Sequence, residues 1–217
     1  MAMLEKRAFN FEIRAQENDN GEKIITGRPI VYNSLTNMGM FDEIIDAGAL
    51  DGADLTDVRF LVNHNTDMIP LARSRRNNGN STMKITPDVN GLNIDFVKLD
   101  TENNADARAL YSAVQRGDIS GMSFMFYIDG DAWENLESER PTRHITKIGS
   151  VVEVSAVTFP AYESTEIYAR TQAAALDNAQ TVLDNARAEA RAASLDNDDN
   201  KNLLALLKEK TKIITRG

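Results

Sequence analysis

The chain has 217 residues, of which 42% are hydrophobic, and a formal net charge of −9 at pH 7. This length is enough for one domain of ordinary size and an additional segment, and the composition is consistent with a buried core. The chain has no cysteine, which excludes disulfide bonds and a cysteine nucleophile. The acidic balance argues against nucleic acid as the main partner, because phosphate binding requires concentrated Lys and Arg.

No window resembles a secretory signal, and no apolar run approaches the roughly 20 residues that span a bilayer. We therefore expect a soluble protein made in the cytoplasm, without a membrane partner. The chain has only two histidines, and they are not closely spaced. Because zinc takes three or four ligands, we expect no metal site, no cofactor and no metal-dependent hydrolase.

Residues 1–168 contain every aromatic residue of the chain and predict a mostly β domain. The runs AFNFEIRAQ, KIITGRPIVYN and VRFLVNHN alternate or are rich in β-branched and aromatic residues, as strands are. A further run, STMKITPDVNGLNIDFVKL, contains the pair Asn90-Gly91. This pair is a strong signal for a two-residue hairpin turn, which we expect between Met83–Ile85 and Leu92–Val97.

One segment of the first part is expected to be helical. The sequence TENNADARALYSAVQRG places Ala107, Leu110, Tyr111 and Val114 on one helix face. It ends at Gly117, a typical C-terminal cap. The fold class we expect is therefore α+β, with mostly antiparallel strands and at least one helix.

Residues 169–217 are expected to be a separate, helical or partly disordered C-terminal extension. The stretch from residue 171 onward has many alanines, no aromatic residue and a balance of seven basic and seven acidic residues. We expect one helix from about residue 165 to 194, a break at LDNDDN and a short amphipathic helix at NLLALLKEK. Two interpretations stay open: a solvent-exposed tail, or a docking segment that folds on a partner.

The two histidines lie in different settings. In VRFLVNHN, strand alternation places Phe60, Val62 and His64 on one face, with His64 at the strand's end where the buried face meets solvent. His144 lies in the more polar PTRHITKIG. For either histidine taken alone, a structural or surface role is more common than a catalytic one.

Two serines interrupt the apolar run ISGMSFMFYI. Alternation places Ser120 on the strongly apolar face with Phe124, where it would be a small filler of the core. Ser123 lies on the opposite face beside Gly121, which would leave open space next to an exposed hydroxyl. Met125 replaces the second glycine of the G-x-S-x-G nucleophile elbow, so Ser123 alone is a weak candidate for a nucleophile.

Glu153 interrupts the valine-rich run VVEVSAVTF. A carboxylate in such a strand is costly unless it is paired or hydrogen-bonded. One interpretation is a half-exposed edge position. The other is a buried acid that orients a histidine, which is the third role in a Ser-His-acid arrangement.

The order VRFLVNHN, RGDISGMSFMF and VVEVSAVTFPAY, with FDEIIDAGAL ahead of it, resembles the prohead (capsid maturation) proteases of tailed bacteriophages. The resemblance covers about residues 5–168. It implies a fold similar to the herpesvirus assemblins, a β-barrel surrounded by helices. It matches Ser123 to the nucleophile, His64 to the general base and Glu153 to the acidic position. In the herpesvirus relatives the third member is a second histidine, which leaves His144 as another candidate.

The resemblance also implies a function and a setting. The chain would be a serine endopeptidase that cleaves the major capsid protein or a scaffold segment, and itself, inside the prohead in the host cytoplasm. Its C-terminal extension would serve assembly. A homo-oligomer stays open. The competing interpretation is a non-enzymatic internal scaffold or core protein of the prohead with the same β domain.

Overall fold

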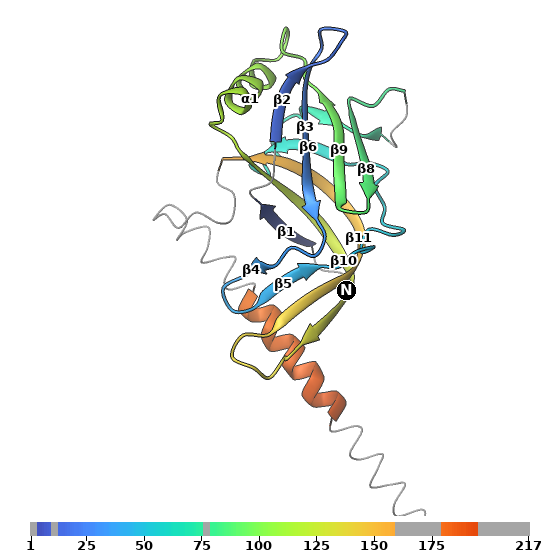
Figure 1. The fold of residues 1–217 in the computed structure, drawn as a ribbon, viewed down its shortest axis with the longest axis vertical. Coiled ribbons are helices and arrows are strands. Elements are labelled where there is room, and N and C mark those ends of the chain that lie inside the picture. Colours follow the sequence, from blue (N-terminus) through green and yellow to red (C-terminus); the bar gives the residue numbers. More distant parts are fainter. Residues whose placement is uncertain (1–3, 10–12, 76–78, 159–178, 195–217) are drawn as a thin grey trace, which may run out of the picture.

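The computed structural model describes residues 4–9, 13–75, 79–158 and 179–194 (Figure 1). Within these ranges the chain is mostly strands with two helices. The strands form two open sheets. The α+β class is confirmed, whereas the closed barrel implied by the family resemblance is not seen, because these sheets do not close on each other.

The larger sheet has the strand order β1-β10-β11-β5-β4, and β6 and β7 are attached to it through β11. It is built around a long antiparallel pair, the 14-residue β10 and the 16-residue β11. Its strands are β1 (Leu4–Phe9), β4 (Thr36–Asn37), β5 (Asp42–Ile45), β6 (Arg59–Val62), β7 (Ala72–Arg73), β10 (Gly121–Glu134) and β11 (Thr142–Val157).

The smaller sheet has the order β2-β3-β9-β8 and is antiparallel throughout. Its strands are β2 (Ile13–Glu17), β3 (Lys23–Val31), β8 (Met83–Asp88) and β9 (Gly91–Lys98). The β8–β9 hairpin confirms the two-residue turn expected in this run, one residue earlier than expected: Val89 and Asn90 lie between the strands, and Gly91 begins β9 opposite Asp88. An added Cβ on Gly91 would lie 2.0 Å from the Ile30 carbonyl oxygen. Its φ of +138° likewise excludes a larger residue at this position.

Helix α1 (Ala105–Arg116) has the expected buried face of Ala107, Leu110 and Val114. The Asn104 side chain caps its first turn, and Gly117 ends it with a φ of +81°. One main core contains side chains of both sheets and of α1, including Ile25 and Leu92 from the smaller sheet and Phe124 from the larger. Burial of this apolar surface is the main force that holds the layers together.

The second helix spans residues 179–194 and contacts the far end of the larger sheet (Figure 1). Ala179 and Leu183 pack in a small cluster with Phe41, and the Arg187 guanidinium donates to the carbonyl oxygens of Leu136 and Ser138. The proposed domain boundary at residue 168, the helix start near residue 165 and the short helix at NLLALLKEK lie outside the described residues. No helix in the described ranges combines the length and apolarity needed to cross a membrane.

One strand expected from the sequence proves to be two. The run AFNFEIRAQ was expected as a single strand, but β1 and β2 on either side of residues 10–12 belong to different sheets. β1 pairs with β10 across a sequence separation of more than 100 residues. Local alternation does not show where a run divides between two sheets, because each half alternates correctly by itself.

Candidate active site

Strand β11 lies between β10, which carries the candidate serine Ser123, and β6, which leads into the turn that carries His64. On one side β10 places Ser123 directly opposite Ser155, and on the other β6 pairs with the same stretch of β11, Leu61 opposite Ser155. Directly opposite residues of an antiparallel pair have Cβ atoms about 4.5–5.5 Å apart. The register therefore brings the three sequence motifs to one place in the larger sheet.

His64 lies in a tight turn that follows β6. Asn63 and His64 have φ values of +51° and +57°, and the Asn65 amide donates to the Val62 carbonyl oxygen at 3.1 Å. Left-handed backbone costs about 1 kcal/mol or more for a residue other than glycine, and such strain is typical of functional sites. Two hydrogen bonds between the Asn63 side chain and Thr158 hold this turn in place. The turn directs the His64 ring back toward β11.

The His64 ring meets the carboxylate of Glu153, which is the buried one of the two placements that the sequence left open for this residue. His64 Nδ1 lies 2.5 Å from Glu153 Oε1, and the exposed fractions of the two side chains are 17% and 1%. An ionised carboxylate can only accept, so Nδ1 carries the proton in this contact. The lone pair is then on Nε2, which is the tautomer that a general base needs.

Ser155 holds both members of this pair. Its hydroxyl donates to Glu153 Oε2 at 2.5 Å and accepts from the His64 backbone amide at 3.1 Å. Sequence analysis missed this residue, although its position two residues after Glu153 places it on the same strand face. Together the three groups form a polar network in which both carboxylate oxygens of the buried Glu153 are hydrogen-bonded.

Ser123 is placed differently from the expectation. It is completely buried, and its hydroxyl donates to the backbone carbonyl oxygen of Arg7 in β1 at 2.7 Å. The expected open space beside Gly121 is filled, because residues 121–126 are buried on both faces of β10. A serine has a single O–H, so this hydroxyl does not donate to His64 in the same conformation.

Ser120 was also misplaced. It precedes β10, which begins at Gly121, and it is exposed rather than a filler of the core. The apolar face that it was expected to share is nonetheless real, since Met122, Phe124 and Phe126 are completely buried. The apolar run begins at Ile119, whereas β10 begins two residues later, at Gly121.

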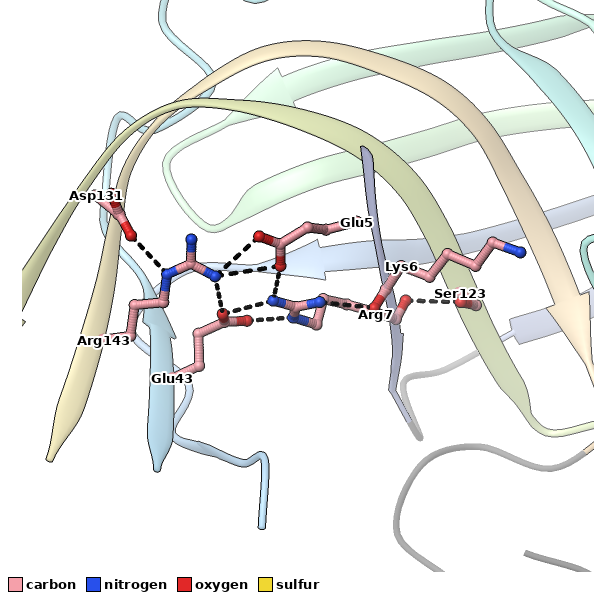
Figure 2. A network of polar contacts seen from close by, with 7 residues as sticks. All are labelled: Glu5, Lys6, Arg7, Glu43, Ser123, Asp131 and Arg143. Atoms are coloured by element: carbon pink, nitrogen blue, oxygen red, sulfur yellow. Dashed lines mark hydrogen bonds and ion pairs between the residues drawn. The ribbon is translucent and has the colours of Figure 1, made fainter. Parts of the chain in front are cut away.

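A buried ion network fixes β1 beside Ser123 (Figure 2). The Arg7 guanidinium pairs with Glu43 and Glu5, and Arg143 pairs with Glu5 at 2.9 Å, Glu43 at 3.4 Å and Asp131 at 2.7 Å. Burial opposes ionisation of Glu5, but the positive charges of Arg7 and Arg143 outweigh it and lower the pKa of this carboxyl. These ion pairs join four strands that are also joined by backbone hydrogen bonds, namely β1, β5, β10 and β11.

His144 is not part of the His64 network. It lies near the start of β11, far from Ser155 near its other end, and its Nδ1 is 2.9 Å from Asp46 Oδ1. The sequence indicated only a polar segment around His144. In the structure this segment is part of β11 and pairs with both β10 and β5. The hydrogen bond to Asp46 raises the pKa of His144.

This raised pKa makes a prediction for stability against pH. A histidine whose pKa is higher in the folded state stabilises fully below its unfolded pKa of about 6.5, and the stabilisation is lost as pH rises through the folded pKa. His144→Gln is therefore expected to destabilise more at pH 5.5 than at pH 8.5, measured by urea unfolding of both proteins. An equal loss at both values would show that the contact with Asp46 does not favour the charged ring.

Comparison with protein families settles the class of the chain. The family model described as caudovirus prohead serine protease matches residues 9–180. The chain belongs to this family. It is therefore a serine protease, a peptide hydrolase, as the resemblance implied. None of the curated proteins and none of the solved structures gives a significant match.

For a prohead serine protease, the described residues supply the His64–Glu153 pair and, on the neighbouring strand β10, Ser123 opposite Ser155. No group of three or more His, Asp or Glu side chains in the described ranges is arranged to hold a metal ion. The family match establishes the class of activity, peptide hydrolysis by a serine protease.

Proposed function

We propose that this prohead protease is a serine endopeptidase in which Ser123 is the nucleophile, His64 the general base and Glu153 the orienting acid. The observation that carries the proposal is the contact between His64 Nδ1 and Glu153 Oε1 at 2.5 Å. A carboxylate acceptor at this distance leaves the proton on Nδ1 and the lone pair on Nε2. Glu153 lies on β11, the strand whose Ser155 is opposite Ser123 of β10. No other described histidine has an equivalent buried acid.

The reaction would run through an acyl-enzyme. Ser123 Oγ attacks the scissile carbonyl carbon while His64 Nε2 takes the hydroxyl proton, and the peptide C–N bond breaks as His64 gives that proton to the leaving amine. Water then attacks the ester by the same route in reverse. Glu153 stabilises the imidazolium that forms in each step, and Ser155 keeps the carboxylate in its orientation.

The proposed substrates are the major capsid protein, a scaffold segment and the protease itself, cleaved inside the prohead. A protease enclosed with its substrate in a shell works at high effective concentration, so each cleavage site can be bound weakly. We assign residues 169–217 to a C-terminal extension for docking or assembly. The described part of this extension, residues 179–194, contacts the far end of the larger sheet, away from His64. These contacts are compatible with a role in docking or assembly.

The test is co-expression of the capsid protein with the wild-type protease, Ser123→Ala or Ser120→Ala, followed by mass spectrometry of the capsid N-terminus. Processing is expected with the wild type and with Ser120→Ala, because Ser120 is exposed and precedes β10. No processing is expected with Ser123→Ala. Processing that persists in Ser123→Ala would remove the assigned nucleophile, and an intact capsid protein with every variant in normal shells would favour a scaffold role.

A smaller effect is expected for Ser155→Ala. A hydrogen bond to a charged group is worth about 1.5–3 kcal/mol, which corresponds to a roughly 10- to 100-fold lower kcat if it acts through the orientation of Glu153. Ser155→Thr retains a hydroxyl and should recover most of the activity. Steady-state kinetics on a peptide spanning the processed site would measure both; full activity of Ser155→Ala would show that Glu153 needs no such support.

A further inference from the structure

Ser123 is closed to any substrate in the described conformation. Its side chain is completely buried, and its hydroxyl is engaged by the carbonyl oxygen of Arg7. A nucleophile must approach a peptide carbonyl to about 3 Å with its proton directed to the base. The segment that holds the hydroxyl must therefore move before catalysis can occur.

That segment is β1, which lies at the edge of the larger sheet. It pairs antiparallel with β10 over residues 4–9, with Ala8 opposite Ser123 and Arg7 opposite Phe124. The other side of β10 is occupied by β11, the strand that carries Glu153 and Ser155. Release of β1 would leave the backbone of β10 unpaired along the stretch that contains Ser123, and an unpaired edge accepts an extended peptide as a new strand.

The side chain of Arg7 indicates what the incoming peptide should carry. Arg7 and Glu43 are 8% and 2% exposed, and Arg7 Nη2 lies 2.7 Å from Glu43 Oε2 (Figure 2). Without Arg7, the ion pair that Glu43 retains among the described residues is the one with Arg143, at 3.4 Å. A buried carboxylate that loses a charged partner is costly, so a peptide with Arg or Lys opposite Phe124 would be favoured.

We infer that the edge of β10 now covered by β1 is the docking site for an extended substrate segment with a basic residue facing Glu43. The inference rests on Ser123 being the nucleophile, as proposed above. β1 is the resident occupant of the site, and its Arg7 carbonyl stands where a peptide carbonyl of the substrate meets Ser123. The chain with β1 in place is latent, and its rate of reaction is limited by the fraction of molecules in which β1 has left.

A reversible disulfide between β1 and β10 tests this directly. Leu4 and Tyr127 lie directly opposite each other and are 46% and 36% exposed. Directly opposite Cα atoms of an antiparallel pair lie about 4.5–5.5 Å apart, within the range that a disulfide spans. Because the chain has no cysteine, the full-length variant Leu4→Cys with Tyr127→Cys can form only this intramolecular disulfide, and intact mass distinguishes it from a disulfide between two chains.

The readout is labelling by a fluorophosphonate, which forms an Oγ–P bond with serine as fluoride leaves and the base takes the hydroxyl proton. The oxidised variant is expected to label at Ser123 at least about tenfold more slowly than the reduced one, since closure of β1 is then enforced. Each single-cysteine variant, with and without reductant, is the matched control and should label at the same rate in both conditions.

Three results are distinguishable. Equal labelling of Ser123 in the oxidised and reduced double variant would overturn the docking inference and leave the nucleophile in place. Absence of label on Ser123 in every form would remove the nucleophile itself and the inference with it. Slower labelling on oxidation, restored by reductant, would support both.

A peptide tests the basic preference in the reduced protein. The peptide of residues 4–9 should slow labelling of Ser123 by occupying the vacated edge, and the same peptide with Arg7→Ala should need at least about tenfold higher concentration for equal effect. Equal potency of the two peptides would contradict the role of Glu43 in recognition.

Discussion

Replacing Glu153 with glutamine is expected to lower the kcat of peptide hydrolysis by about 10⁴-fold. The carboxylate accepts from His64 Nδ1 on one oxygen and from Ser155 Oγ on the other. An amide has no charge to stabilise the imidazolium, and its NH₂ group can donate to Nδ1 and favour the wrong tautomer. The loss should fall on kcat rather than on KM, because the interaction strengthens in the transition state.

The measurement is the initial rate of cleavage of a peptide that spans the processed site, by purified full-length protein. Glu137→Gln is the matched control, since Glu137 is an exposed residue in the β10–β11 connection, and its rate should equal that of the wild type. A Glu153→Gln protein that retains more than about a tenth of the wild-type kcat would show that His64 does not depend on this acid. In that case another group would have to fill the third role.

Replacing Arg143 with methionine is expected to lower the free energy of unfolding by about 3–5 kcal/mol. Arg143 is buried, and it contacts three carboxylates, those of Glu5, Glu43 and Asp131. Without it, Glu5 and Glu43, which are 9% and 2% exposed, share the single positive charge of Arg7, and Asp131 loses its ion pair with Arg143. Removing one partner of a buried ion network costs far more than replacing the whole network by apolar residues.

Arg140→Met is the matched comparison, because it removes an exposed ion pair with Asp42 of β5 in the same sheet. Arg140 pairs with Asp42 through two hydrogen bonds, but its side chain is 45% exposed. An exposed pair of this kind is worth about 1 kcal/mol or less. Urea unfolding of both variants at pH 7 should separate the two losses by at least 2 kcal/mol, by the same estimates; similar losses would mean that the buried network contributes no more than an ordinary surface pair.

The elements that local chemistry determines were predicted well. The β8–β9 hairpin forms where the Asn90-Gly91 pair indicated it, although its loop residues are Val89 and Asn90 and Gly91 already belongs to β9, and α1 has the expected buried face and ends at Gly117. In each case the signal lies next to the structure that it specifies. For Glu153 the sequence left two interpretations open, an edge position and a buried acid, and the structure shows the buried one.

The surroundings of Ser123 could not be predicted in the same way. Alternation along β10 identified the face of Ser123 but not what covers it. One neighbour, β1, lies more than 100 residues earlier in the chain, and the other, β11, follows β10 directly but sets Ser155 opposite Ser123 only through a register that contains bulges. β1 supplies the carbonyl oxygen that binds the hydroxyl, and β11 supplies the opposing Ser155. Such pairing depends on strand register, which no local pattern contains.

The position of His64 shows the same limit. Alternation placed it on the strand face of Phe60 and Val62, but β6 ends at Val62, and a left-handed turn at Asn63 and His64 directs the ring to Glu153. Asn and His are both enriched in left-handed backbone, but residue type alone does not locate such a turn. Ser155, by contrast, could have been identified from its spacing of two residues from Glu153, had the strand face been considered as a whole.

The central claim is that Ser123 is the nucleophile and that His64 activates it. The most direct test is to treat the full-length protein with a fluorophosphonate and to map the modified residue by mass spectrometry, in the wild type and in His64→Ala. The account predicts one adduct, on Ser123, that forms at least about 10³-fold more slowly in His64→Ala. An adduct on Ser155 or Ser120, or one on Ser123 that forms equally fast without His64, would contradict it.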